Sequence, residues 1–177
     1  MKKLILAALA GTCAVGAMAE SPLWLRNVAI SPDGTTIAFT YKGDIFTVPA
    51  AGGTARQITS NPAYDSYPVW SPDGSKIAFM SHRDGSDDVF VVDAKGGTAK
   101  RLTTYSGSEQ PKAWLDNETV LFTANLTPSA QAAQGPFAAQ VYEVKTDGSR
   151  PRMYSTIPMA AISVAADGAV LYQDRKG

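Results

Sequence analysis

The pattern Ser-Pro-Asp-Gly-x-x-Ile-Ala-Phe occurs twice in this chain, 40 residues apart, at 31–39 and 71–79. A second phrase follows each copy: Gly-Gly-Thr-Ala-Arg at 52–56 and Gly-Gly-Thr-Ala-Lys at 96–100. Phrases of this length that return at a period near 40 residues are typical of an array of similar small sheets. A single unit of that kind cannot bury its apolar faces alone, so the repeat constrains the fold more than any other property of the chain.

The first repeat unit predicts four short strands, at residues 27–30, 36–41, 45–48 and 56–59. Residues 31–34 fit a type I turn, with serine first, proline second, and aspartate and glycine closing the turn. In the second strand, large apolar residues alternate with alanine and threonine, which is the period of a strand. The unit is therefore expected to form a small sheet of consecutive strands.

The second unit repeats this order, the third is eroded, and the fourth begins near residue 162. The strands expected in these units are 68–70, 76–81, 88–92 and 100–103, then 119–122, 140–144 and 152–154, and finally 162–164 and 169–172. The turn aspartates Asp33, Asp73, Asp116 and Asp167 are separated by steps of 40, 43 and 51 residues. The longest step contains an insertion, Asn125–Ala139, and loops on one face of a repeat array absorb insertions of this kind.

Four strands in about 40 residues predict the blade of a β-propeller, whose radial arrangement leaves only short sheet edges exposed. We therefore predict an all-β fold: a partial β-propeller with about three four-stranded blades and the start of a fourth. The blades are expected at approximately 25–60, 64–104, 110–155 and 160–177, the last of them truncated. A stacked linear array is the alternative, but the known linear β arrays have shorter periods.

Aromatic residues recur at equivalent places in the repeat. Trp70 and Trp114 precede the turns of the second and third units, and the second strands carry Phe39, Phe79, Phe122 and Tyr172. Recurrence at one structural place is what packing between blades predicts. We therefore interpret these residues as core rather than as a ligand cage.

Residues 1–19 predict an export signal, with a basic start, an apolar stretch at 4–15 and an A-x-A cleavage site at Ala17–Ala19. The apolar stretch is too short for a stable membrane anchor. Lipidation at Cys13 is an alternative, which is disfavoured because the preceding residue is threonine rather than a small residue. We expect cleavage after Ala19 and a periplasmic or otherwise exported protein made of residues 20–177.

Cleavage would remove the only cysteine and two lysines, leaving 14 basic and 16 acidic residues. The mature chain could then form no disulfide. Its near-neutral charge gives no electrostatic footprint for nucleic acid or for an anionic membrane surface. No further apolar run is long enough for a membrane helix. The composition therefore disfavours nucleic-acid binding and a membrane span.

Residues that could carry chemistry are few. His82 is the only histidine, and Ser81 and Asp84 lie near it in an expected loop, but neighbouring loop positions rarely converge as nucleophile, base and orienting acid. A solvated loop histidine is therefore preferred. The acidic run at 84–88 lacks the ligand spacing of a calcium loop, so a polar turn is preferred there. We expect no catalytic, cofactor-binding or metal-binding residue in this segment, and no cofactor.

The stretch Trp70–Phe79, followed by Asp88–Val91 and Gly96–Thr98, resembles a known bacterial propeller repeat. It is similar to the WD-like repeat of the periplasmic Tol–Pal propeller protein and of tricorn-type serine proteases. The resemblance covers nearly all of Leu23–Gly177. The repeat is specific for the propeller fold and a poor guide to function, because unrelated proteins carry it.

The start of the chain separates the two groups. Residues 22–26 lead from the expected signal directly into the first blade, whereas the Tol–Pal protein has an α/β domain at that place. Exported tricorn-like proteases begin with the propeller, and residues 22–33, 41–46 and 172–177 resemble their amino-terminal region. The resemblance implies a serine-based catalytic group near the carboxyl terminus of such a protease, so no catalytic residue can be assigned to this chain.

The favoured hypothesis is an amino-terminal propeller fragment of an exported tricorn-like serine peptidase. This segment would bind or gate peptide substrate or dock other domains, without catalytic residues of its own. One alternative is a non-enzymatic periplasmic interaction propeller of Tol–Pal type. Another is the propeller of a prolyl-oligopeptidase-like exported peptidase. The expected partners are a peptide or protein substrate or other domains of the same chain, and an oligomer is compatible with the sequence.

Overall fold

The computed structural model describes residues 24–124, 140–155, 157, 159–165 and 167–174. Within these ranges every regular element is a β-strand, and the strands form three four-stranded sheets and one two-stranded sheet. The predicted signal and insertion lie outside the described residues. The prediction of an all-β, partial propeller with about three four-stranded blades and the start of a fourth is confirmed.

Each sheet is an antiparallel meander whose strands pair in chain order. Blade 1 comprises β1 (Arg26–Ile30), β2 (Thr36–Tyr41), β3 (Asp44–Pro49) and β4 (Arg56–Gln57). Blade 2 comprises β5 (Asp65–Trp70), β6 (Lys76–Ser81), β7 (Asp88–Asp93) and β8 (Lys100–Arg101). Blade 3 comprises β9 (Glu109–Trp114), β10 (Thr119–Ala124), β11 (Gln140–Lys145) and β12 (Arg152–Ser155), and blade 4 comprises β13 (Met159–Val164) and β14 (Val170–Asp174).

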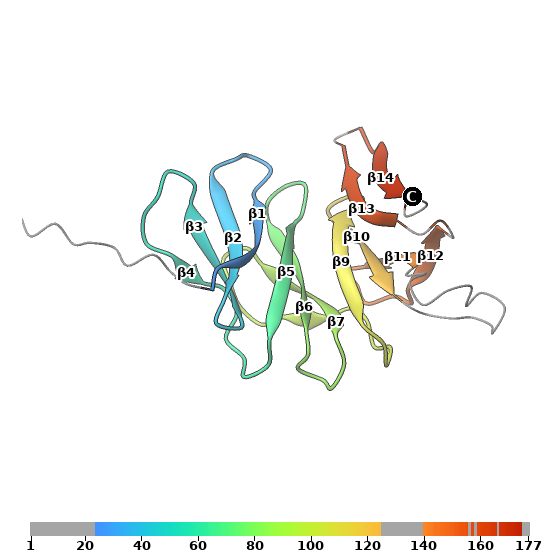
Figure 1. Ribbon diagram of the computed structural model, residues 1–177, viewed down its shortest axis with the longest axis horizontal. Coiled ribbons are helices and arrows are strands. Elements are labelled where there is room, and N and C mark those ends of the chain that lie inside the picture. Colours follow the sequence, from blue (N-terminus) through green and yellow to red (C-terminus); the bar gives the residue numbers. More distant parts are fainter. Residues whose placement is uncertain (1–23, 125–139, 156, 158, 166, 175–177) are drawn as a thin grey trace, which may run out of the picture.

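The four sheets follow one another across the molecule in chain order (Figure 1). Their first strands are neighbours, because β1 contacts β5, β5 contacts β9, and β9 contacts β13. This is the arrangement of a propeller, in which blades are placed radially around a central axis. We call β1, β5, β9 and β13 the inner strands.

The apolar core is divided into three parts, one for each pair of successive blades. The direction of the side chains alternates along β6, so neighbouring residues belong to different parts of the core. Phe79 points to blade 1, and its neighbour Ala78 points to blade 3. Because neighbouring side chains on a strand point to opposite faces, blades 2 and 3 are each packed on both faces. The three parts centre on Ile45, Ile58, Phe79 and Phe90 between blades 1 and 2, on Val91, Trp114, Phe122 and Tyr142 between blades 2 and 3, and on Leu121, Val141 and Met159 between blades 3 and 4.

A stacked aromatic pair joins the second and third strands of each four-stranded blade. The pairs are Phe39–Phe46, Phe79–Phe90 and Phe122–Tyr142, with ring centroids 6.0, 5.9 and 5.7 Å apart. In each pair the two residues are direct cross-strand partners. The predicted packing between blades holds at Phe79 and Phe122, whereas Phe39 is buried outside the core parts between blades and Tyr172 on β14 is exposed.

The turns after the inner strands are of two lengths. In blades 1 and 2 the N–H of the turn serine donates to a carbonyl five residues on, at Thr36 and Lys76. In blades 3 and 4 the corresponding bonds, from Leu115 to Thr119 and from Ala165 to Ala169, span only four residues. The eroded third turn is therefore one residue shorter than the Ser-Pro-Asp-Gly turns, and it still reverses the chain at the same place.

Candidate functional site

The inner strands end side by side and form a groove. Its volume is about 610 Å³, and most of its lining residues are apolar and come from all four blades. The last residues of β1, β5, β9 and β13 are Ile30, Trp70, Trp114 and Val164, and all four line the groove. We call this hollow the inner-strand groove. A concave apolar site of this size is the usual form of a ligand pocket.

Hydrogen bonds across the blade seams fix the two tryptophans of the groove. Trp70 Nε1 donates to the carbonyl oxygen of Ala29 at 3.2 Å, and Trp114 Nε1 donates to that of Val69 at 3.0 Å. Each indole thus bonds to the inner strand of the preceding blade. Because a buried indole N–H needs an acceptor, these bonds determine which part of each ring faces the groove.

Proline residues extend the apolar surface at the rim. Pro32 and Pro72, from the turns of blades 1 and 2, line the groove together with Trp70. The same three residues also line a second, neighbouring hollow of about 400 Å³ between these turns. Proline offers an apolar ring and no backbone N–H. The two prolines therefore add apolar surface beside Trp70, next to the polar side chains of the same turns.

The turn aspartates beside the groove serve the turns themselves. Ser71 Oγ donates to Asp73 Oδ1 at 2.6 Å, and the N–H of Ser75 donates to the same oxygen at 3.0 Å. These bonds lower the pKa of Asp73 to about 2, with the Ser71 hydroxyl as the largest cause. Asp33 in blade 1 has the same bonds, led by that from Ser31, and its pKa is likewise lowered to about 2. Both carboxylates are ionised at neutral pH and saturated by local donors, so they stabilise turns rather than act as acids.

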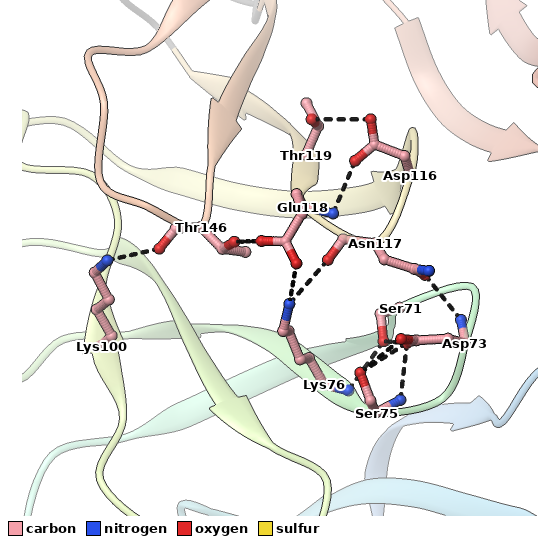
Figure 2. Close-up of polar contacts among 10 residues, drawn as sticks. All are labelled: Ser71, Asp73, Ser75, Lys76, Lys100, Asp116, Asn117, Glu118, Thr119 and Thr146. Carbon is pink, nitrogen blue, oxygen red and sulfur yellow. Dashed lines mark hydrogen bonds and ion pairs between the residues drawn. The ribbon is translucent and has the colours of Figure 1, made fainter.

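A polar clip joins the turns of blades 2 and 3 (Figure 2). Lys76 Nζ donates to the Asn117 carbonyl oxygen at 3.1 Å and to Glu118 Oε1 at 2.5 Å, while Asn117 Oδ1 accepts the N–H of Asp73 at 3.0 Å. The Thr146 hydroxyl donates to Glu118, and the Lys76 and Thr146 bonds lower the pKa of that glutamate. Asn117 also lines the groove, so the clip holds one of its walls.

The clip is specific to this seam. Thr36 and Thr119 begin β2 and β10, where Lys76 begins β6, and neither is long enough to bridge to the next turn. The Lys76–Glu118 pair is largely exposed, with 30% and 63% of the two side chains accessible. Exposed pairs of this kind contribute about 0–1 kcal/mol. The clip therefore sets the position of the turns more than it stabilises the fold.

The only histidine of the chain lies at the end of blade 2 that is opposite to the inner-strand groove. His82 Nδ1 is 3.0 Å from Asp87 Oδ1, and the histidine side chain is 59% exposed. Ser81 Oγ accepts a bond from Arg83 Nε at 2.9 Å instead of approaching His82. The structure thus brings His82 to a carboxylate but does not bring it to Ser81.

Each carboxylate of the acidic run at 84–88 has a neighbouring side chain as its partner. Asp84 and Asp88 face Arg101 at 3.4 and 2.7 Å, while Asp87 accepts from Ser108 Oγ at 3.1 Å. Among the described residues no group of three or more histidine, cysteine, aspartate or glutamate side chains is arranged to hold a metal ion. In the same part of the chain, no helix is long and apolar enough to cross a membrane.

The sequence of this chain can now be compared with known proteins. Residues 22–177 match the model of the tricorn protease N-terminal beta propeller domain. The chain belongs to this family. Sequence relatives of the domain include tricorn protease homolog 1 of Streptomyces coelicolor, 37% identical over 66 residues, and a TolB homolog of Chlorobium luteolum, 39% identical over 65 residues. Dipeptidyl-peptidase 5 of Porphyromonas gingivalis is 36% identical over 35% of this chain.

These sequence matches are partial on both sides. The first two cover 37% of this tricorn-type propeller chain, and the three span 6%, 14% and 10% of the relatives' own lengths. Among solved structures, a putative TolB from Agrobacterium tumefaciens is 27% identical with a TM-score of 0.66, covering 85% of this chain and 55% of that one. The tricorn protease itself gives a TM-score of 0.68 at 23% identity, covering 86% of this chain and 15% of that one, which shows the fold alone.

The groove residues were not predicted as a site from the sequence. Trp70 and Trp114 were interpreted as core, and they do pack between blades while also lining the groove. Ile30 replaces tryptophan at the equivalent position of blade 1 and is 61% exposed there. The one signal available in the sequence is that both tryptophans stand directly before a turn. Side chains at strand ends lie at the edge of a sheet, where loops and ligands are found.

Proposed function

We propose that this chain is the amino-terminal propeller portion of an exported tricorn-like serine peptidase, and that it binds peptide in the inner-strand groove. The observation that carries the proposal is the groove itself, which joins two tryptophans at strand ends and two prolines from turns of a tricorn-type propeller. The chemistry of the parent enzyme would be carried by residues outside this segment. Export is part of the proposal and is supported by the signal-like sequence at 1–19.

A peptide suits the groove because the lining residues combine apolar surface with polar groups. The lining offers apolar surface from Ile30, Trp70 and Val164 and polar groups from Asp116 and Asn117. An extended peptide carries alternating side chains together with backbone donors and acceptors. Its apolar side chains would be buried against the indoles, and its backbone would meet the polar groups. Ligand sites in general combine apolar walls with a few polar groups that fix orientation.

The Ile30→Asp variant tests this proposal. Ile30 is exposed, so the change is expected to leave stability within about 0.5 kcal/mol. A carboxylate in the apolar groove should weaken peptide binding at least about tenfold, the equivalent of about 1.4 kcal/mol. The measurement is the fluorescence anisotropy of labelled peptides from a casein digest, titrated with wild type and variant.

The matched control is Val28→Asp. Val28 lies on the same face of β1, is also exposed, and is not part of the groove. It should leave peptide affinity unchanged. Absence of peptide binding by the wild-type chain, or equal losses in both variants, would show that the groove is not a peptide site.

A second candidate function is a non-enzymatic interaction propeller of TolB type. The observation in its favour is the 27% identity to the putative TolB structure, which extends over 85% of this chain. Capture of a folded envelope lipoprotein, with no binding of unfolded peptides, would select this candidate. The match to dipeptidyl-peptidase 5 supports a third, the propeller of an exported prolyl-oligopeptidase-like enzyme. A Gly-x-Ser-x-Gly motif in the coding sequence beyond Gly177 would select it.

A further inference from the structure

A glutamate without a hydrogen-bond partner lies buried between blades 2 and 3. Glu109, the first residue of β9, is fully buried, and neither of its carboxyl oxygens has a hydrogen-bond partner. Asp88 on β7 is also fully buried, and its Oδ1 likewise has no partner. A buried ionised carboxylate without a partner is strongly destabilising, so such groups are paired or neutralised. The question is what neutralises Glu109.

Blade 2 shows how the repeat normally solves this problem. Asp65 begins β5 as Glu109 begins β9, and each donates its N–H to the carbonyl of a preceding loop, at Gly43 and Asp87. The Asp65 carboxylate accepts two bonds from Arg83 Nη2, at 3.0 and 2.9 Å. Arg83 stands two residues after the end of β6, and its guanidinium neutralises the buried acid.

Blade 3 has no such arginine. The residues that follow β10, at 125–139, contain no lysine, arginine or histidine in their sequence. On the blade 2 side, Arg101 donates to Asp88 Oδ2 at 2.7 Å and to the Thr103 carbonyl oxygen at 2.8 Å. Ser86 Oγ donates to the same Asp88 oxygen at 3.1 Å. The donors therefore gather on Asp88 Oδ2 and leave Oδ1 and Glu109 without one.

The charged groups on the elements packed against β9 give no other neutralising partner. The strands β10 and β13 carry no titratable side chain at their described positions. On β5, Asp65 is held by Arg83 and Tyr67 is exposed. At the far end of β6 Lys76 joins the clip, at the far end of β7 Asp93 accepts the N–H of Lys95, and on β9 itself Lys112 donates to Gln110. In the loop before β7, His82 faces Asp87 and Asp84 faces Arg101. Burial is the largest cause that raises the pKa of Glu109 to about 7; the Thr103 hydroxyl and the Tyr105 backbone act to lower it, and Asp88 adds to the rise.

We propose that Glu109 keeps its proton in the folded protein and donates it to Oδ1 of Asp88, so that one shared proton joins blade 3 to blade 2. A proton on Glu109 removes the buried charge of that glutamate and gives Asp88 Oδ1 the donor it lacks, while Arg101 and Ser86 donate to the other oxygen of Asp88. Loss of the proton places two carboxylates side by side in a buried seam. The Trp114 bond to Val69 spans the same seam, so alkaline pH would loosen one wall of the inner-strand groove.

The pH dependence of stability tests the shared proton. A carboxyl group whose pKa is raised on folding stabilises the protein fully when the pH is below the pKa of that group in the unfolded chain. The stabilisation is lost progressively as the pH rises to the pKa of the group in the folded protein. For Glu109 this window runs from 4.5 to about 7. Urea unfolding of the full chain should show the folding equilibrium constant falling by up to about tenfold for each pH unit in that window, and levelling off above it.

The Glu109→Gln variant should flatten this dependence, because its amide still donates to Asp88 and does not titrate. Glu143→Gln is the matched control: Glu143 lies on the neighbouring blade 3 strand β11, is only partly buried, and should leave the wild-type dependence in place. If Glu109→Gln retains the wild-type pH dependence, the proposal is wrong. It is also wrong if calcium restores wild-type stability at alkaline pH, because a cation rather than a proton would then be the natural occupant.

A measurement on the wild type alone covers the case in which the variant fails to fold. Infrared difference spectra recorded while pH is raised should show the carbonyl band of one protonated carboxyl group disappearing as pH passes through about 7. Loss of all protonated carboxyl signal below about pH 5, the ordinary range for glutamate, would overturn the proposal.

Discussion

The Arg83→Met variant is expected to unfold with a free energy about 3–5 kcal/mol below that of the wild type. Arg83 donates to both oxygens of Asp65, whose side chain is fully buried, and its Nε donates to Ser81 Oγ. Methionine fills similar space but leaves the buried carboxylate without a donor. The guanidinium also lies 4.6 Å from the ring centroid of Phe90, so a cation–π contact is lost as well.

A second substitution separates the buried charge from the lost packing. The double variant Arg83→Met, Asp65→Leu removes both charges and should recover most of the loss, because apolar pairs replace buried ion pairs at little cost. Arg83→Lys keeps the charge but not the planar fork, so an intermediate loss is expected. Urea unfolding measures all three variants. A loss below about 1 kcal/mol for Arg83→Met would mean that Asp65 is not buried as described.

The Phe79→Ala variant is expected to lose about 3–5 kcal/mol, the range for truncating a fully buried phenylalanine. Phe79 is 0% exposed, stacks on Phe90 at 5.9 Å, and belongs to the core between blades 1 and 2. Its removal leaves a cavity at a seam that the two sheets can close only by moving together. Thermal unfolding followed by circular dichroism measures the effect.

The equivalent residue of blade 1 gives the matched control. Phe39 occupies the position of Phe79, stacks on Phe46 in the same way, and lies on the face of blade 1 against which no described sheet packs. Phe39→Ala should therefore cost clearly less than Phe79→Ala. Equal losses would show that the seam between blades contributes no more than the aromatic pair within a blade.

Local chemistry explains which strands the sequence predicted well. The strands expected at 36–41 and 76–81 have the bounds of β2 and β6, because a Ser-Pro-Asp-Gly turn fixes their start and side-chain alternation runs through them. The third strands, β3 and β7, were placed within one residue at each end for the same reason. Turn residues and alternation act over a few residues, so they can be recognised without tertiary contacts.

The inner and outer strands were predicted less well, for identifiable reasons. The second inner strand was expected at 68–70 but begins at Asp65, because a bulge between Ser66 and Val69 interrupts its alternation. Tyr67 adopts a φ of 54° in that bulge. The outer strand expected at 56–59 is only Arg56–Gln57, because the Thr59 hydroxyl, rather than a backbone carbonyl, accepts the N–H of Ile45 at 2.9 Å.

Neither the groove nor the buried pair could be predicted from the sequence. The groove depends on the convergence of four strand ends that are 40 or more residues apart in the chain. The Glu109–Asp88 proximity depends on how blade 3 packs against blade 2. The repeat does contain a signal for the buried pair. Glu109 aligns with Asp65, but the segment of the third unit that corresponds to Arg83 contains no basic residue.

The central claim is that peptide binds where the inner strands end, and photo-crosslinking tests it most directly. A benzophenone amino acid is placed at position 30, in the groove, or at position 105, an exposed site before the opposite end of β9. The two ends of a six-residue strand such as β9 are roughly 17–20 Å apart. We expect labelled peptide to be captured at position 30 and not at position 105; capture at 105 alone, or equally at both, would contradict the account.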